Sequence, residues 1–126
     1  MANQQVTQKP LVYSCSGCSN IAQLANQLAI DLDREHLAEM SCIAGIGGGV
    51  ESLVKKARSG RRIIALDGCP LHCVKNCLKQ RCLQADLHYT LSEFGIRKRY
   101  HLDFDEADLE KIKQHLLGDM AHEGWL

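Results

Sequence analysis

The sequence has no run of 18 or more apolar residues, the length that a membrane-spanning helix requires. Fifteen basic and fifteen acidic residues balance to a net charge of zero, and no basic run interleaved with aromatic side chains is present. These absences argue against a membrane span and against nucleic acid as the main partner. Met1–Lys9 is polar and lacks the apolar core of a secretion signal, so we expect a cytoplasmic protein.

Cysteine, by contrast, is abundant, with seven residues in a chain of 126. An odd number cannot all pair within the chain, and a domain of this length buries enough surface to fold without disulfide bonds. In a reducing compartment, clustered cysteines indicate metal binding or thiol chemistry more often than a disulfide framework. The sequence therefore predicts a functional thiol site.

Apolar runs and helical spacings alternate along the chain in strand–helix order. This order predicts a three-layer α/β fold of the Rossmann-like or flavodoxin-like kind, with a mostly parallel open sheet of about four strands and flanking helices. Residues 1–9 are expected to be a disordered lead, 10–118 a single domain and 119–126 a C-terminal tail. The expected strands are 11–13, 38–43, 62–66 and 87–91, with 100–104 a strand or an extended connection; the expected helices are 21–34, 50–58, 70–83 and 105–117, the last ended by Gly118.

The stretch Asp67–Cys77 holds three of the cysteines and follows the third expected strand. Pro70 is best tolerated at the first helical position, which would put Cys69 at the N-cap and Cys73 about one turn further on the same face. The helix dipole and the unpaired amides favour thiolates there. Asp67 would either orient the loop by accepting backbone N–H bonds or act as a base, although no partner for a base is evident.

The carboxyl ends of the first three expected strands each carry a cysteine, namely Cys15, Cys42 and Cys69. Ligands of open parallel sheets collect at this edge, so we expect the three sulfurs to converge there, with Cys73 beneath them. Four thiolates form the closed tetrahedral site that zinc prefers, although iron–sulfur clusters and Cu(I) suit the same donors. Cys18 forms a C-x-x-C pair with Cys15 and could substitute as a ligand, whereas Cys42 could equally be a small buried apolar residue.

Two further cysteines are expected to stand outside this site. Cys77 lies two helical turns from Cys69, roughly 12 Å along the helix axis, which is too far for one shared ion. Cys82 is expected to point away from Cys73, because nine residues correspond to two and a half helical turns, which puts the two side chains on opposite faces.

Thiol chemistry without a metal is the alternative function. The pairs Cys15/Cys18 and Cys69/Cys73 could serve a thiol–disulfide oxidoreductase or a sulfur (persulfide) carrier, because a thiol at a helix start is activated. No catalytic residue can be assigned for this function from the sequence.

Nucleotide binding at the glycine-rich segment Gly45–Gly49 is a weaker alternative. The segment is expected to follow a strand and open a helix, and Asp67 ends the next strand. However, the third glycine position of a dinucleotide fingerprint is Val50, so the signal is weak. A glycine turn that lets the backbone pass close to a packed loop explains the segment equally well.

Three separated motifs, in order, resemble the DGC-domain family over about Leu11–Arg97. The resemblance implies a zinc site of four cysteines with one ion per chain, and it implies no settled catalytic activity or protein partner. The motifs are Cys15-Ser16-Gly17, the segment Met40–Gly47 and Asp67-Gly68-Cys69-Pro70-Leu71-His72-Cys73; the implied ligands are Cys15, Cys42, Cys69 and Cys73.

Overall fold

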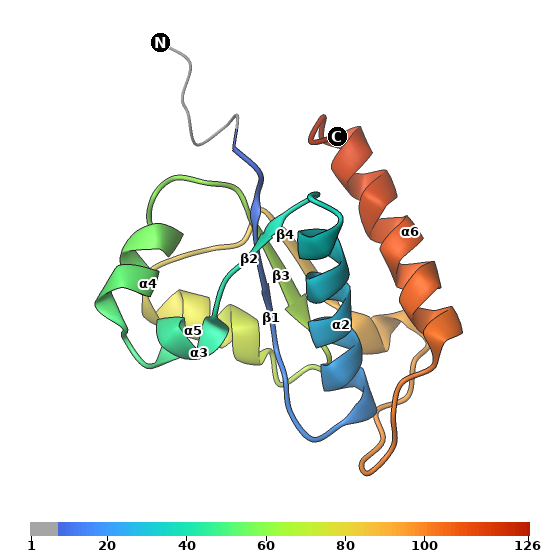
Figure 1. Cartoon of the computed structure of the whole chain (residues 1–126). Helices are drawn as coiled ribbons and strands as arrows, with labels where there is room; N and C mark the ends of the chain where they lie inside the picture. The colour runs from blue at the N-terminus through green and yellow to red at the C-terminus, as the bar shows by residue number, and fades with distance from the viewer. Residues whose placement is uncertain (1–7) are drawn as a thin grey trace.

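A computed structural model describes residues 8–126, so residues 1–7 of the expected N-terminal lead lie outside the described part of the chain. Four parallel strands form one sheet in the order β2-β1-β3-β4, and helices cover both of its faces (Figure 1). The predicted three-layer α/β fold is confirmed. The strands are β1 (Leu11–Ser14), β2 (Glu39–Met40), β3 (Ile63–Asp67) and β4 (Leu87–Thr90).

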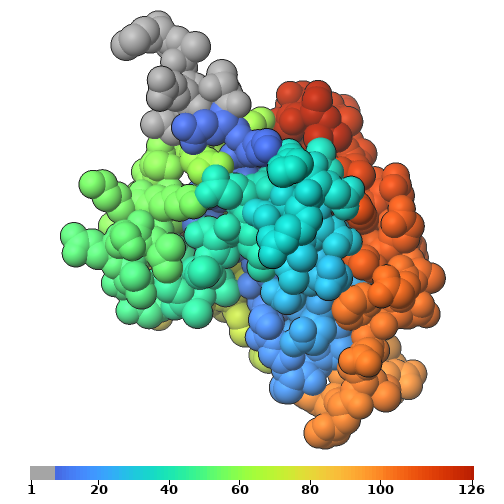
Figure 2. All heavy atoms as spheres, in the orientation of Figure 1, coloured from blue at the N-terminus to red at the C-terminus, as the bar shows by residue number. Residues whose placement is uncertain are grey.

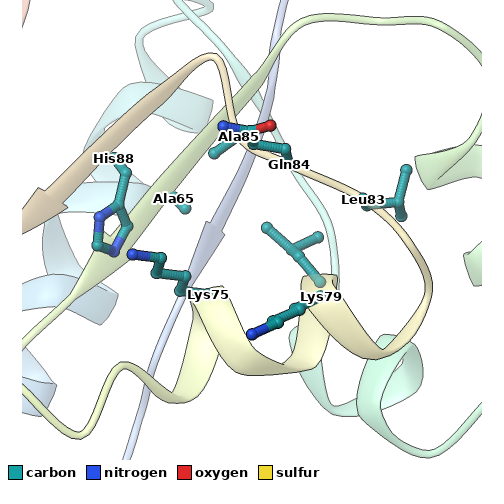
Figure 3. Close-up of a pocket in the computed structure, with 8 residues that line it drawn as sticks. Ala65, Lys75, Lys79, Leu83, Gln84, Ala85 and His88 are labelled. Atoms are coloured by element: carbon teal, nitrogen blue, oxygen red, sulfur yellow. The ribbon is translucent and has the colours of Figure 1, made fainter.

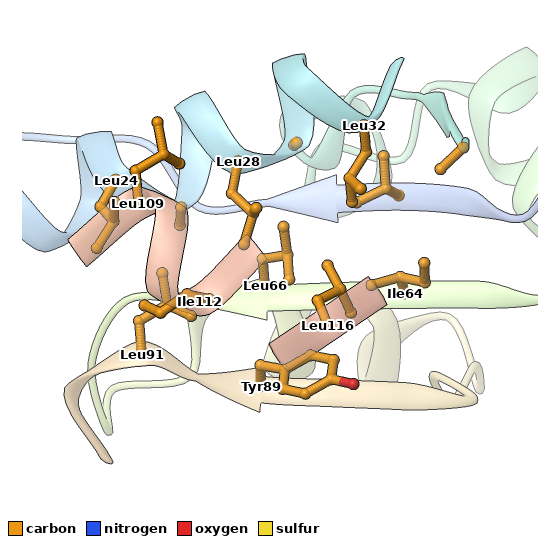
Figure 4. Close-up of a cluster of buried hydrophobic side chains, with 14 of the residues drawn as sticks. Leu24, Leu28, Leu32, Ile64, Leu66, Tyr89, Leu91, Leu109, Ile112 and Leu116 are labelled. Atoms are coloured by element: carbon orange, nitrogen blue, oxygen red, sulfur yellow. The ribbon is translucent and has the colours of Figure 1, made fainter. Parts of the chain in front are cut away.

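Two long helices, α2 (Asn20–Arg34) and α6 (Glu106–His122), cover one face of the sheet. Ser19 is the N-cap of α2, because its hydroxyl accepts the Ala22 N–H at 3.1 Å. Leucines at helical spacing on α2 meet the apolar residues of β3, β4 and α6 in one large core (Figure 4). Fully buried members of this core include Leu24, Leu28, Leu32, Ile64, Leu66, Leu91 and Leu116.

Three short helices cover the other face: α3 (Ile43–Gly47), α4 (Glu51–Ala57) and α5 (Cys73–Gln80). Their core is smaller and ends before the edge strand β4. Within residues 8–126, none of the helices combines the length and the apolar character needed to cross a membrane. The buried residues of this second core are Leu11, Tyr13, Ile46, Ala57, Ile63, Ala65, Val74 and Leu78.

The alternation of side chains along β4 divides that strand between the two faces. Tyr89 pairs with Leu66 of β3 and belongs to the α2–α6 core. His88 pairs with Ala65 and points to the α5 side instead, as period-two alternation requires. The polar residues of β4 therefore gather on the thinly covered face.

The C-terminal third departs from the sequence-based expectations at the end of the last helix, whereas residues 100–104 form the extended connection that was one of their two expected forms. The prediction that Gly118 ends the last helix is wrong, because α6 continues to His122 and buries Met120 against the core. Residues 100–104 form no strand; a short 3-10 helix, η1 (Leu91–Phe94), and an extended connection lead into α6, and Tyr100 makes an isolated bridge to Ser19. Figure 2 shows α6 (orange to red) flanking α2 (blue to cyan), with this connection protruding beneath them.

Candidate functional site

Three of the predicted ligands follow the carboxyl ends of three adjacent strands. Cys15 comes directly after β1, Cys42 two residues after β2, and Cys69 two residues after β3. Because these strands are parallel and neighbours in the order β2-β1-β3, the cysteines lie along one edge of the sheet with Cys15 in the middle. Cys73 is the first residue of α5, which begins beyond the same edge. The predicted placement at the strand ends is confirmed.

Cys15 is half-buried, and its sulfur is tied to the turn that follows β3. The Cys15 Sγ accepts the backbone N–H of Gly68 at 3.2 Å. Burial raises the pKa of the Cys15 thiol to about 11; the Gly68 N–H opposes this shift, while the negative charges of Asp67, Cys73 and Cys69 add to it. The hydrogen bond from Gly68 places the Cys15 sulfur beside the turn that carries Cys69.

Gly68, the centre of the Asp-Gly-Cys motif, packs directly against the start of α2. A Cβ at this position would lie 2.9 Å from the carbonyl oxygen of Ile21 and 3.1 Å from the amide nitrogen of Ala22. The Gly68 carbonyl also accepts the Ser92 N–H at 2.9 Å. Glycine is required here because two backbones approach more closely than a side chain would permit.

Asp67, at the end of β3, is 1% exposed. Its side chain caps the start of α5, although it lies several residues before that helix in the sequence. Its Oδ1 accepts the Val74 N–H at 2.8 Å, and its Oδ2 accepts the Lys75 N–H at 3.2 Å. These amides belong to the first turn of α5 and have no partner within the helix, and the carboxylate also suits the positive end of the helix dipole. The predicted role of Asp67 in orienting the loop by accepting backbone N–H bonds is confirmed.

The residues between β3 and α5 form a turn. The His72 N–H donates to the Cys69 carbonyl at 3.1 Å, and His72 takes the left-handed conformation (φ 53°) just before α5 begins at Cys73. The prediction that Pro70 opens the helix and Cys69 caps it is therefore wrong. The reason is that the Asp67 side chain takes the first amides of the helix, which leaves Cys69 in the preceding turn.

A histidine cluster beside this turn was missed by the sequence analysis. The His88 Nε2 lies 2.8 Å from Asp67 Oδ2, and the His72 Nε2 lies 2.9 Å from the Thr90 hydroxyl. The rings of His72 and His88 meet edge to face with 5.2 Å between their centroids. The sequence does contain a signal for this cluster. Side chains alternate between the two faces of a strand, so His88 and Thr90, two residues apart in β4, lie on the same face.

Lys98 is the second group that the sequence analysis missed. Its ammonium group lies 3.4 Å from the Cys69 Sγ and 5.3 Å from the centroid of the Tyr100 ring. Hydrogen bonds to Tyr100 and Cys69 raise the pKa of Lys98. Figure 1 shows the connection from η1 to α6 (orange) reaching the same end of the molecule as the loop after β1. No motif marks Lys98, so only the fold brings it to the thiol.

Cys42 occupies a different environment from the other three predicted ligands. It is exposed and lines a hollow of about 370 Å³ together with Ser14 and Ser16. Cys42 is also the N-cap residue of α3, although its side chain makes no capping hydrogen bond.

The remaining cysteines differ in burial. Cys18 and Cys82 are exposed, and Cys82 adopts a left-handed conformation (φ 59°). Cys77 is half-buried between α5 and α3, where burial raises its pKa. A Cβ at Gly47 would lie 2.9 Å from the Cys77 Sγ, so the two helices meet at this sulfur.

The donors at the sheet edge suit a soft metal in their chemistry but do not form a closed ligand sphere. Within residues 8–126, no three His, Cys, Asp or Glu side chains are spaced so that they could hold a metal ion. Thiolate ligands must come within about 2.3 Å of a zinc ion. A metal would therefore have to draw the loops that carry Cys15, Cys42 and Cys69 closer together.

The glycine-rich segment is not the turn that a dinucleotide site needs. Gly45 and Gly47 lie inside α3, and only Gly48 and Gly49 form the turn into α4. A Cβ at Gly45 would lie 2.1 Å from a methyl group of Leu53, so close helix packing explains this glycine. The expected strand–turn–helix geometry is therefore wrong at this segment, whereas the alternative of a close backbone approach agrees with the structure.

Comparison with known proteins defines the class of this chain. Residues 11–116 match the DGC domain, and the chain belongs to that family. It is similar to AnvM, the anaerobic and virulence modulator of Pseudomonas aeruginosa, with 64% identity over 103 residues that cover 82% of this chain and 79% of AnvM. No solved structure matches the chain significantly.

Proposed function

We propose that this protein binds one soft metal ion, preferably zinc, through the thiolates of Cys15, Cys69 and Cys73, with Cys42 as the fourth ligand. The observation that carries the proposal is geometric: Cys15, Cys42 and Cys69 follow the carboxyl ends of three adjacent parallel strands, and Cys73 opens α5 beyond the same edge. Cys18 is the substitute ligand, because it lies in the same loop as Cys15 and is exposed. Four thiolates would give a closed tetrahedral site, which favours a structural or sensory ion over a catalytic one.

The loops around the site support the rearrangement that binding would need. Cys42 and Cys73 are exposed, so their side chains can turn toward Cys15 without displacing the core. Cys69 lies in a turn and not in a helix, which leaves its backbone freer to adjust. The relative AnvM is named as a modulator, and we propose for this chain a regulatory role in which the thiol site senses metal or redox state.

Metal analysis of anaerobically purified protein tests the proposal. The expected result is one zinc equivalent per chain in the wild type, lost in Cys69→Ser and retained in Cys77→Ser, the matched control from α5. Metal-free wild-type protein with all thiols reduced and a normal circular dichroism spectrum would refute it. A metal retained in Cys42→Ser and lost in Cys18→Ser would reassign the fourth ligand.

Thiol redox chemistry is the second candidate, and the contact between Lys98 and Cys69 favours it. An ammonium group near a sulfur stabilises the thiolate, which is the nucleophile in thiol–disulfide exchange. The Cys69 thiolate would attack a substrate disulfide, forming a mixed disulfide and releasing one thiolate; attack by Cys73 would then release the second and leave a Cys69–Cys73 disulfide. The protein would lose two electrons, and the substrate would be reduced to two thiols.

Equilibration in glutathione redox buffers, followed by peptide mapping, distinguishes this candidate from metal binding. A Cys69–Cys73 or Cys15–Cys18 disulfide that forms in metal-free protein and disappears in the corresponding Cys→Ser variant would support it. Glutathione adducts distributed over all exposed cysteines, with no internal disulfide, would exclude it.

A further inference from the structure

A groove of about 400 Å³ lies between α5 and the edge strand β4, on the face of the sheet that the short helices cover. It is separate from the thiol edge: its walls come from the exposed side of α5, from β4 and from the segment 83–85. The β4 side chain that faces the groove is His88, and the floor includes Ala65 of β3 and Leu78 of α5. Ala65 is small, which leaves depth beneath the helix.

Two lysines line this groove from successive turns of the same helix. Lys75 and Lys79 are four residues apart on α5, and both are exposed. Like charges at this spacing weaken a helix by a few tenths of a kcal/mol. Within residues 8–126, every lysine in an ion pair belongs to another helix, so neither groove lysine has a carboxylate within 4 Å. Figure 3 shows Lys75 extending toward the ring of His88, with Lys79 one turn further along.

The nearest buried carboxylate does not neutralise these lysines through a side-chain contact. The two oxygens of Asp67 accept hydrogen bonds from the backbone N–H groups of Val74 and Lys75, and Oδ2 also contacts the Nε2 of His88. Asp67 thus fixes the orientation of His88 at one end of the groove and caps the helix that carries both lysines. The result is a groove with two ammonium groups that form no ion pair, over an apolar floor.

We propose that this groove binds small organic phosphates, meaning phosphate monoesters with a compact apolar body. Two ammonium groups complement a doubly charged phosphate, because each lysine supplies a point charge and several N–H donors. The apolar body would lie on Ala65 and Leu78, with Leu83 and Ala85 along the far wall and the Gln84 amide at the rim. This site goes beyond the thiol function and does not depend on it.

Titration of the ¹⁵N-labelled, reduced full-length chain with phenyl phosphate at constant ionic strength tests the proposal. We expect saturable shifts in the amide signals of Lys75, Lys79, Gln84 and His88. The double variant Lys75→Gln/Lys79→Gln should bind at least tenfold more weakly. The control Lys55→Gln/Lys111→Gln, which removes two exposed charges elsewhere, should bind like the wild type.

Two further probes separate the parts of the site. Inorganic phosphate should bind several-fold more weakly than phenyl phosphate, because it gains nothing from the apolar floor. Phenol should not bind measurably. Equal weakening in both double variants, equal affinity for phosphate and phenyl phosphate, or shifts confined to another region would each overturn the proposal. All four substituted lysines are exposed, so the spectra of the free variants should confirm an intact fold.

Discussion

The two faces of the sheet use the same strands but are covered in different ways. The face under α2 and α6 is almost entirely apolar, and its residues come from helices 15 and 17 residues long. The face under α3, α4 and α5 is covered by helices of five, seven and eight residues, and it carries Asp67, His88 and Thr90 on its open side. We therefore expect the first face to supply most of the stability, whereas the second leaves the groove beside β4 open.

The largest expected effect on the free energy of unfolding comes from truncating one buried leucine on each face. Leu28→Ala removes a fully buried side chain from the α2–α6 face and should lower the free energy of unfolding by about 2–5 kcal/mol. Leu78→Ala should cost less, near the lower end of that range, because Leu78 borders an open groove that can relax. Urea denaturation of both variants checks this contrast, and equal losses would contradict it.

A methyl group at Gly68 should disturb the junction of the two faces. Gly68→Ala forces its Cβ to within about 3 Å of the α2 backbone, so the strand end or the helix must shift. We expect a loss of roughly 1–3 kcal/mol in the free energy of unfolding, as for other overpacked sites. Gly118→Ala is the control, because nothing lies within 4 Å of its Cβ and the position is helical; it should be neutral or stabilising.

Removing the charge of Asp67 should affect only the α5 face. Asp67→Asn keeps the shape but loses the carboxylate that caps α5 and holds His88, and we expect a loss of about 0.5–2 kcal/mol. Hydrogen exchange should show faster opening of α5 amides with little change in α2. Uniformly faster exchange in both helices would mean that the two faces are not independent in stability.

The smallest effect concerns two cysteines on the α5 side. Burial raises the pKa of Cys77, whereas Cys82 is exposed. Alkylation at pH 8 should therefore be several-fold slower at Cys77, and its rate should rise with pH toward and beyond the ordinary thiol range. Trypsin separates the two sites into the peptides 76–79 and 82–97, so mass spectrometry measures each rate. Equal rates would show that α3 does not protect Cys77.

The fold could be predicted from the sequence where one physical signal dominated. Helical spacing of leucines predicted α2, and short apolar runs predicted β1 and β3. The start of α5 could not be predicted in this way, because local rules favour Pro70 as the first helical residue. The competing interaction, from Asp67 to the amides of α5, depends on a carboxylate seven residues earlier being buried at the sheet edge.

The sequence predicted where the cysteines of the site lie, but it did not predict which other side chains surround them. Parallel strand order was enough to place Cys15, Cys42 and Cys69 at one edge. The approach of Lys98 to Cys69 spans 29 positions and depends on how the connection before α6 folds back. The distances between the thiols could not be predicted from the sequence either, because they depend on loop conformations and not on the order of the strands.

The packing of Gly47 against Cys77 has an evolutionary consequence. There is so little room between α3 and α5 that the side chains at positions 47 and 77 compete for the same space. A larger residue at position 47 would therefore require a smaller one than cysteine at position 77. Substitutions there should occur in pairs among homologous chains. Cysteine can then persist at position 77 purely for its size, and its persistence would say nothing about ligand chemistry.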